Sequence, residues 1–321
     1  MNTVPLRVAV VIPCFRVGPL VLDVIERIGP EVDRIYVVDD CCPLGTGAMV
    51  ATGCSDPRVS VIVHPENRGV GGAVMSGYRA GLADGMDIIV KIDGDGQMDP
   101  ALVGRFIAPI IEGRADYTKG NRFHRLRNVR AMPRVRLLGN TVLSFMTKLS
   151  SGYWQVFDPT NGYTAIHRAA LQELDLQELS ARYFFESDML FQLNQARAVV
   201  LDIPMMAKYD DEPSSLSPGR IIAPFLRGHI RNTIRRVFGT YFLRGFSVAS
   251  IELLAGMALT GFSVCFGSQA WYLSVANATP ASAGTVMLAA LPLILGFQLL
   301  LSWLNFDIAA EPRTPLQHLM R

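Results

Sequence analysis

The sequence predicts an α/β domain with a mostly parallel β-sheet, then an amphipathic helix, then a hairpin of two membrane-spanning helices. In the first half of the 321-residue chain, short β-branched runs alternate with helical patterns, as is typical of βαβ units. From Leu253 to Phe306 there is no Asp, Glu, Lys, Arg or His, and a spanning helix needs only about 20 apolar residues. Between these parts, apolar residues recur at helical spacing from Arg220 to Phe242, with arginines on another face.

The elements of the sheet follow from these runs. Strands are expected at about Arg7–Ile12, Arg34–Val38, Val59–Val63, Ile88–Ile92, Tyr117–Lys119 and Val199–Ile203. Helices are expected near Leu20–Ile28, Gly45–Thr52, Val70–Asp84 and Pro100–Ile111. Right-handed crossovers between parallel strands bring the carboxyl ends of the strands to one edge of the sheet, where such sheets bind ligands. The residues that follow the strands are therefore expected to converge there.

An acidic pair follows the fourth expected strand, in the run Lys91-Ile92-Asp93-Gly94-Asp95-Gly96-Gln97. Mg²⁺ and Mn²⁺ prefer hard oxygen ligands and usually enter such sites with a substrate pyrophosphate. Asp93 and Asp95 are therefore predicted to hold a metal–nucleotide complex. The alternative is an Asp/Gly turn after a buried strand.

A stretch from Lys119 to Arg136 is basic and contains no acidic residue. It holds Lys119, Arg122, Arg125, Arg127, Arg130, Arg134 and Arg136. Arginine forks suit phosphates, and in a membrane-anchored chain a lipid phosphate or a nucleotide pyrophosphate is favoured over nucleic acid. A solvated loop is the other interpretation. The basic amphipathic helix from Arg220 to Phe242 is expected to lie in the headgroup layer, or else to pack on the soluble domain.

Two spans are expected at about Val248–Ala276 and Gly284–Phe306, with a polar turn between them. Arginines flank the hairpin on both outer sides and the turn carries no charge, so the α/β domain and both termini are expected to be cytoplasmic. Two helices buried in a large soluble core are the alternative. The expected parts are the α/β domain (residues 1–210), amphipathic juxtamembrane helices (211–246), the two spans (247–307) and a cytoplasmic tail (308–321). Five cysteines without a C-x-x-C pair suit a reducing compartment and argue against structural zinc. The first apolar run, Val8 to Ile12, lacks the features of a signal peptide.

Taken together, the motifs resemble the GT-A glycosyltransferases of family 2. Val11-Ile12-Pro13, Asp39-Asp40, His64-Pro65-Glu66-Asn67-Arg68-Gly69 and the run from Lys91 to Gln97 occur in the order and approximate spacing of that family. The likeness covers about residues 6 to 205. With the hairpin added, the whole plan is similar to the polyprenol-phosphate sugar transferase branch, which implies a GT-A fold. The chain departs from the usual pattern at Cys14 and at Asn161-Gly162-Tyr163.

The resemblance implies roles for individual residues. The nucleoside pocket would be lined by Pro13 and by Asp39 or Asp40, and the nucleotide would be held by Asn67, Gly69 and Gly71. The metal would be bound by Asp93 and Asp95, and the nucleotide or its phosphates would be contacted by Lys91, Lys119, Arg122 and Arg125. Gln97 would lie beside the donor sugar or the acceptor phosphate, Asp158 would border sugar and acceptor, and the family's acid pair would be Glu186 and Asp188. Simpler interpretations stay open. A strand-end turn would account for Asp40, a helix cap for the residues around Asn67, and helix N-terminal carboxylates for Glu186 and Asp188.

The expected activity is inverting, metal-dependent transfer of a hexose from a UDP- or GDP-sugar to a polyprenyl phosphate such as undecaprenyl phosphate. The metal would be Mg²⁺ or Mn²⁺, nucleic acid is not an expected partner, and the place is a membrane, the bacterial inner membrane by this resemblance. A hydroxyl acceptor would instead require Asp158 or Asp188 as a base. A non-catalytic membrane-anchored nucleotide-binding protein is a further alternative. Glu252 would lie at the membrane interface or pair with a second protomer in a homo-oligomer.

Overall fold

The structure, a computed structural model, describes residues 6–124, 134–206 and 218–320. It divides into two compact units, Met1–Ile234 with Pro312–Arg321, and Arg235–Glu311. The first unit thus takes in most of the expected amphipathic helix and the last ten residues, which the sequence assigns to separate parts. The four expected boundaries stay a prediction.

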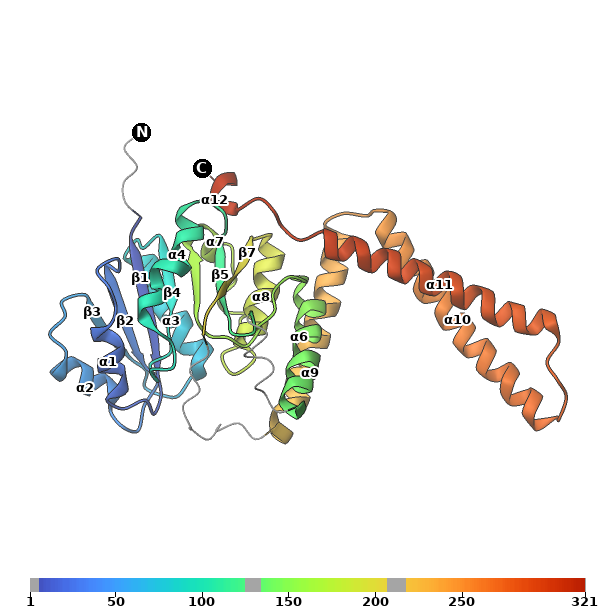
Figure 1. The fold of residues 1–321 in the computed structure, drawn as a ribbon, viewed down its shortest axis with the longest axis horizontal. Coiled ribbons are helices and arrows are strands. Elements are labelled where there is room, and N and C mark those ends of the chain that lie inside the picture. The colour runs from blue at the N-terminus through green and yellow to red at the C-terminus, as the bar shows by residue number, and fades with distance from the viewer. Residues whose placement is uncertain (1–5, 125–133, 207–217, 321) are drawn as a thin grey trace. The chain divides into compact units, whose positions relative to one another are not determined.

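The first unit is built on a seven-stranded sheet in the order β3-β2-β1-β4-β6-β5-β7 (Figure 1). The strands are β1 (Val8–Cys14), β2 (Arg34–Asp39), β3 (Val59–Val63), β4 (Ile88–Lys91), β5 (Tyr117–Asn121), β6 (Thr164–His167) and β7 (Val200–Pro204). β6 is antiparallel to β4 and β5, whereas β1 pairs in parallel with β2 and β4, β2 with β3, and β5 with β7. The predicted mostly parallel sheet and its six strands are confirmed, and β6 is the addition.

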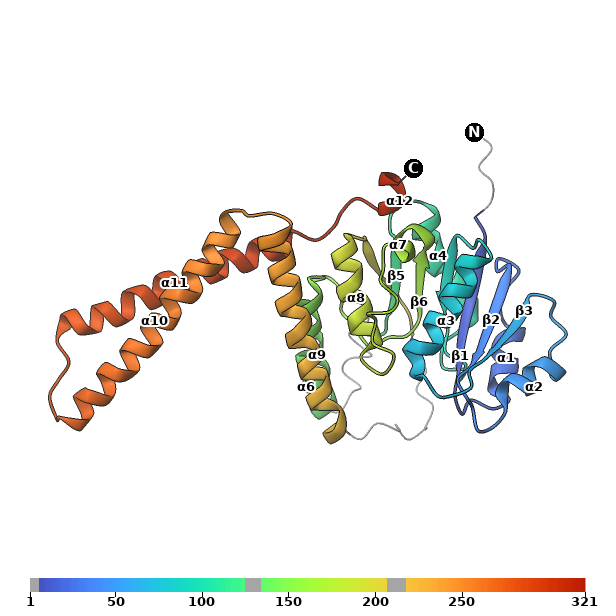
Figure 2. The ribbon, with the colours of Figure 1, turned by 180° about the vertical axis from the view of Figure 1, so that it is seen from behind.

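Helices cover both faces of the sheet, because alternate residues of the buried strands point to opposite sides. The helices are α1 (Leu20–Glu26), α2 (Thr46–Gly53), α3 (Gly69–Ala83), η1 (Pro100–Leu102), α4 (Val103–Ile111), α6 (Arg134–Ser151), α7 (Arg168–Gln172), α8 (Phe185–Ala196), α9 (Pro218–Phe238) and α12 (Leu316–Leu319). Val8, Val10 and Ile12 of β1 belong to a core with α1, α2 and α4, whereas Ala9 and Val11 belong to a core with α3, α7 and α8 (Figure 2). The expected helices are present, and α6, α7, α8 and α12 are additional.

α12 belongs to the first unit through contacts with Asp116, at the start of β5. The Asp116 carboxylate is fully buried and accepts hydrogen bonds from the amides of Val199, Leu316 and Gln317 at 2.8, 2.9 and 3.3 Å. The Gln317 side chain donates to the carbonyls of Ile110 and Ala115, each at 3.0 Å. A segment expected to be a cytoplasmic tail therefore completes the core of this unit.

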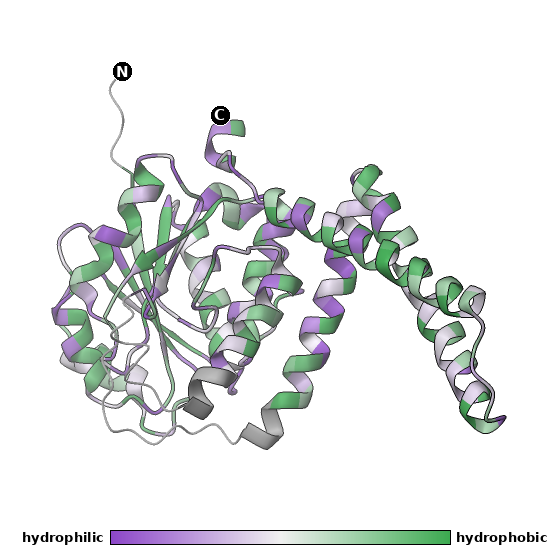
Figure 3. Ribbon diagram, turned by 45° about the vertical axis from the view of Figure 1, so that its right-hand side comes forward, coloured by the Kyte–Doolittle hydropathy of each residue, from purple (hydrophilic) through white to green (hydrophobic). Residues whose placement is uncertain are grey.

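The second unit is dominated by α10 (Val248–Ala276) and α11 (Ala283–Ala309), which are long and apolar enough to cross a membrane by length and composition (Figure 3). Most of their apolar side chains are exposed, so no soluble core buries them. Glu252 of α10 accepts a 2.8 Å hydrogen bond from Ser302 of α11. Between α9 and α10, the π-helical turn η2 (Gly239–Leu243) carries Tyr241, whose hydroxyl donates to Asp307 at 2.7 Å; Asp307 also pairs with Arg236.

Candidate functional site

A cavity of about 700 Å³ opens at the carboxyl edge of the sheet. Eight of the residues that the sequence assigns to the site line it, namely Pro13, Asp40, Asn67, Gly69, Lys91, Asp93, Asp95 and Glu186. They come from the ends of β1, β2 and β4, from the start of α3 and from α8. Parallel strands bring these distant segments together, as expected for a sheet of this type.

Asp39 and Asp40 have different surroundings although they are adjacent. The Asp40 carboxylate lines the cavity and accepts hydrogen bonds from the amides of Arg68 and Gly69 and from His64 Nδ1, each at 2.8 Å. The Asp39 carboxylate instead accepts from the amides of Cys42 and Gly47 at 2.6 Å each, at the start of α2. Asp40 thus positions the first residues of α3 beside the cavity, whereas Asp39 orders the turn behind it.

Lys91 lies at the base of the cavity between two carboxylates. Its ammonium, 1% exposed, is 2.9 Å from Asp93 Oδ1 and 3.4 Å from Glu186 Oε1. Burial alone would lower the pKa of Lys91, but the carboxylates of Asp93 and Glu186 outweigh burial and raise it above its usual value. Gly162 leaves room for this contact, because a Cβ there would stand 2.3 Å from Lys91 Nζ and 2.8 Å from Asp93 Oδ2.

Asp93 and Asp95 offer a divalent metal two carboxylates on one short loop. Both line the cavity, and the backbone amide of Gln97 donates to Asp95 Oδ1 at 3.0 Å, which orders the loop. Within the described residues no group of three or more His, Cys, Asp or Glu side chains could hold an ion. Two protein carboxylates with substrate phosphates and waters completing the coordination suit Mg²⁺, which rarely uses an all-protein cage. The donor set therefore fits a metal that arrives with a phosphorylated ligand.

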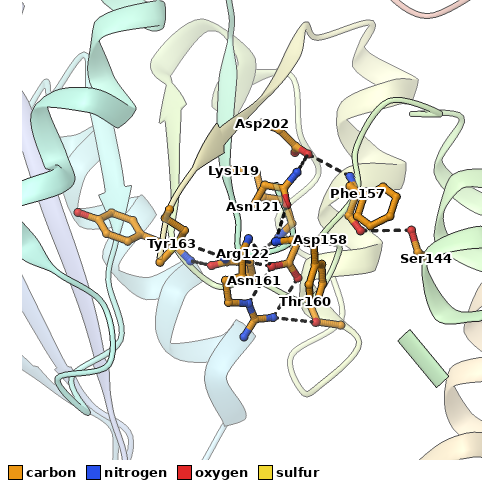
Figure 4. Close-up of polar contacts among 12 residues, drawn as sticks. Lys119, Asn121, Arg122, Ser144, Phe157, Asp158, Thr160, Asn161, Tyr163 and Asp202 are labelled. Carbon is orange, nitrogen blue, oxygen red and sulfur yellow. Dashed lines mark hydrogen bonds and ion pairs between the residues drawn. The ribbon is translucent and has the colours of Figure 1, made fainter. Parts of the chain in front are cut away.

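A second polar cluster lies around Arg122 and Asp158 (Figure 4). The Arg122 guanidinium holds the fully buried Asp158 carboxylate in a two-pronged ion pair, with hydrogen bonds of 2.7 and 2.9 Å. Lys119, also fully buried, donates to the carbonyl of Asn161. Burial lowers the pKa of Lys119 to about 8, against the attraction of the Glu186 and Asp158 carboxylates. Lys119, Arg122 and Asp158 do not line the cavity but order the loop that contributes Thr160 to it.

The remaining predicted residues have other positions. Asp188 is 1% exposed and its carboxylate accepts hydrogen bonds from Ser180 and Asn232. Gln97 lines a second cavity of about 490 Å³. Gly71 is buried against the carbonyl of Ser180. Arg125, with Arg127 and Arg130 of the basic stretch, lies outside the described residues. Asp188 does stand in the first turn of a helix, as the simpler interpretation expected. The roles given to all these residues stay predictions.

Further cavity residues that were not identified from the sequence include Thr160, Arg182, Tyr183, Ser187 and Phe225. Arg182 is exposed and makes no ion pair with a carboxylate in the part of the chain that the structure describes. Arg182 and Tyr183 stand a few residues before the acid pair Glu186 and Asp188, and this closeness in sequence is the signal that could have pointed to Arg182. Phe225 belongs to α9, so the amphipathic helix contributes to the cavity wall.

Asp202 of β7 gives a prediction about stability and pH. Burial raises its pKa to about 6, although Phe157 and Asn121 donate hydrogen bonds to Oδ2; Oδ1 has no partner within the described residues. Because the folded state then favours the protonated acid, this carboxylate costs stability progressively as the pH rises from about 4 to about 6. The Asp202→Asn variant should be more stable than the wild type by up to about 3 kcal/mol at pH 7.5. Thermal unfolding at pH 4 should show no gain; an equal gain at both pH values would contradict the raised pKa.

Comparison with known proteins gives consistent matches. The family model described as Glycosyl transferase family 2 matches residues 9–175. The UDP-N-acetylglucosamine–dolichyl-phosphate N-acetylglucosaminyltransferase of Methanococcus voltae is 33% identical over 154 residues, which are 48% of this chain and 61% of that protein. The polyprenol monophosphomannose synthase of Mycolicibacterium smegmatis is 30% identical over 205 residues, 62% of this chain and 76% of that protein. Glucosyl-3-phosphoglycerate synthase of Mycobacterium tuberculosis, solved with Mn²⁺, UDP and phosphoglyceric acid, has a similar fold, with a TM-score of 0.51, 20% identity and coverage of 72% of this chain and 78% of that one.

Proposed function

The chain belongs to glycosyl transferase family 2, and on this basis we propose that it transfers a hexose from a nucleoside-diphosphate sugar to a polyprenyl phosphate. The observation that carries the proposal is the joint presence of a cavity with the Asp93–Asp95 pair at the strand ends and two exposed apolar helices in the same chain. The relatives named above act on dolichyl and polyprenol phosphates but on two different sugars. The lipid phosphate is therefore proposed as acceptor, and the sugar is left to experiment.

The donor is proposed to bind with its diphosphate over Asp93 and Asp95 and its nucleoside beside Pro13 and Asp40. A divalent metal bound there with the diphosphate would supply charge neutralisation for the leaving group. Lys91 fixes the direction of the Asp93 carboxylate through a 2.9 Å ion pair, in which the lysine side chain is buried. Arg182 adds a second positive charge, besides Lys91, at the wall of a cavity whose other charged groups are the carboxylates of Asp40, Asp93, Asp95 and Glu186.

The proposed reaction is a single in-line displacement with inversion. An oxygen of the acceptor phosphate forms a bond to the anomeric carbon while the bond from that carbon to the β-phosphate oxygen breaks, and the nucleoside diphosphate leaves with the electron pair. A phosphate monoester has a second pKa of about 6, so its oxygen is already anionic at neutral pH. The protein then needs to position two anions rather than remove a proton. Because this mechanism needs no carboxylate base, the burial of Asp158 and Asp188 is compatible with it.

The same proposal places the reaction at a membrane surface. On α9, Ile222, Leu226, Ile230 and Ile234 are exposed at intervals of four residues, while Phe225 and His229 pack against Phe184 on the other side. This pattern combines the two expectations for the helix, since one face packs on the domain and the other suits lipid. The chain leaves the first unit at Ile234 and re-enters it at Pro312, so both ends of the hairpin are proposed to lie on one side of the membrane, and the flanking arginines favour the cytoplasmic side.

A direct assay tests the proposed function. Full-length protein in detergent with undecaprenyl phosphate would be supplied with a panel of UDP- and GDP-linked hexoses, with Mg²⁺, with Mn²⁺, or with excess chelator. We expect a lipid-extractable sugar phosphate with one donor, formed only when metal is present. Transfer that requires a hydroxyl acceptor, or nucleotide binding without transfer to any lipid phosphate, would contradict the proposal in favour of one of its alternatives.

Arg182 gives a specific prediction for this assay. Replacing Arg182 with Ala should raise the KM for the donor or for the lipid phosphate about tenfold or more, because a charge-assisted hydrogen bond to a phosphate is lost. Separate titration of the two substrates identifies which phosphate it contacts. Arg79→Ala, which removes an exposed arginine of α3 that does not line the cavity, is the matched control and should leave both KM values unchanged. Equal KM values in the Arg182 variant and the wild type would remove Arg182 from the site.

A further inference from the structure

One wall of the cavity is the segment 180–188, defined here as the wall segment. It supplies Arg182, Tyr183, Glu186 and Ser187 to the lining. The two ends of this segment are joined by Asp188, whose Oδ2 accepts a 2.8 Å hydrogen bond from the amide of Ser180. The wall segment is therefore a closed loop whose shape depends on the position of the Asp188 carboxylate.

The other oxygen of Asp188 is held by α9. Its Oδ1 accepts a 2.7 Å hydrogen bond from Asn232 Nδ2, and both side chains are almost completely buried. Arg231 also approaches Oδ1, but at 3.5 Å and with half of its side chain exposed. A buried carboxylate is costly unless its oxygens are satisfied by donors. Asn232 is the close, buried donor that reaches this carboxylate from outside the wall segment.

α9 contacts the wall segment at a second point, through Phe184. The Phe184 ring packs edge-on against Phe225 and His229, with ring centroids 5.4 and 5.0 Å apart. At Gly228 a Cβ would come within 2.7 Å of the Phe184 ring, so α9 lies in direct backbone contact with it. His229 is itself fixed by a 2.8 Å hydrogen bond to Ser150 of α6. These contacts leave α9 and the wall segment little freedom to move independently.

We propose that Asn232 is a positioning residue for the reaction: through Asp188 it fixes the wall segment, so that Arg182 and Glu186 face the donor only when α9 is docked. The opposite face of α9 carries the exposed apolar side chains assigned above to the lipid surface. The inference rests on the proposed function for the identity of the ligand in the cavity, whereas the hydrogen bond between Asn232 and Asp188 is independent of that function. It gives the membrane-proximal helix a direct part in shaping the cavity.

Swapping the residues at positions 188 and 232 tests the role of the hydrogen bond between them. Asn232→Asp places two carboxylates at hydrogen-bond distance in a buried site, where they repel. We expect kcat/KM for the donor to fall about tenfold or more, since such a misfit costs over 1.4 kcal/mol. In the double variant Asp188→Asn with Asn232→Asp, the amide introduced at position 188 can donate to the carboxylate introduced at position 232, and its oxygen can still accept from Ser180. Activity should return to within about threefold of the wild type, as each donor again has an acceptor.

Two further measurements separate this role from a general loss of folding and from a failure of the proposed function. Ala51→Asp adds the same charge to an exposed site on α2, outside α9 and outside the cavity lining, and should change kcat/KM less than twofold. Amide hydrogen exchange of peptides covering the wall segment should be faster in Asn232→Asp than in the wild type. Asn232→Ala, which should show the same acceleration, replaces it if the aspartate variant does not fold. Amide hydrogen exchange should be slow again in the double variant. The exchange measurement is informative even in the absence of sugar transfer. Unchanged amide hydrogen exchange and unchanged activity in both Asn232→Asp and Asn232→Ala, or no recovery in the double variant, would overturn the inference.

Discussion

Replacing Asp95 with Asn should reduce sugar transfer at least about 100-fold while leaving the fold intact. Asp95 lies on the loop after β4, lines the cavity and has one oxygen held by the amide of Gln97, a contact that an asparagine oxygen can keep. What the variant loses is negative charge at the proposed metal site, and a neutral amide is a much weaker ligand for Mg²⁺ than a carboxylate. The measurement is kcat for transfer at saturating donor, followed by titration with Mn²⁺.

Asp99→Asn is the matched control for this prediction. Asp99 lies four residues further along the same loop, pairs with Arg27 at the surface and does not line the main cavity. Asparagine is as good a helix N-cap as aspartate, so the start of the helical segment at Pro100 should be preserved. Activity in this control should stay within twofold of the wild type. An Asp95 variant as active as the Asp99 variant would exclude Asp95 from metal binding.

Replacing Lys91 with Met should destabilise the domain by about 2–3 kcal/mol, because it leaves the partly buried carboxylates of Asp93 and Glu186 without their shared cation. Asp93 and Glu186 would then face each other around an apolar side chain, and their like charges would repel. For a domain of this size the expected loss corresponds to a fall of roughly 4–12 °C in the unfolding midpoint. Thermal unfolding followed by tryptophan fluorescence measures it, and transfer activity should be lost in parallel.

Two comparisons identify the cause of the loss. Lys119→Met removes another fully buried lysine from a neighbouring part of the sheet, but burial lowers the pKa of Lys119 whereas the pKa of Lys91 is raised. The charge on Lys119 is thus poorly compensated, and its removal should cost much less stability. Adding Glu186→Gln to the Lys91 variant should recover part of the lost stability, since one of the two unpaired carboxylates disappears. Equal losses in both lysine variants, with no recovery, would show that repulsion is not the reason.

Much of the fold was predictable because it follows from local patterns. The β-branched runs and helical periods predicted six strands near their observed bounds, and the first span, Val248–Ala276, has the expected bounds. β6 was not predicted because Thr164–His167 is a run of only four residues without an alternating pattern, and because it pairs antiparallel in an otherwise mostly parallel sheet. α6 escaped because the arginines at its start favoured the interpretation as a basic loop. Such segments are determined by what they pack against, which periodicity does not report.

For the site, the sequence predicted which strand ends meet, but it did not predict the contacts of the individual side chains. Topology brings Asp40, Asp93 and Asp95 to one cavity, and the sequence motifs pointed to all three. The sequence could not decide between Asp39 and Asp40, because the choice depends on which carboxylate the amides at the start of α3 reach. It also treated Arg122 and Asp158 as separate site residues. In the structure they neutralise each other across a separation of 36 residues, a pairing that no local pattern encodes.

The contacts of Asp116 have a consequence for how the protein is made. During translation this carboxylate can bind the Val199 amide well before Leu316 and Gln317 exist, because these are synthesised about 200 residues later. Both apolar helices are translated in the interval, so the last two hydrogen bonds to Asp116 can form only after the proposed membrane hairpin has been synthesised. A hairpin inserted with its second end on the wrong side would leave Asp116 without two of its three donors, and biosynthesis would itself discriminate against that misinserted chain.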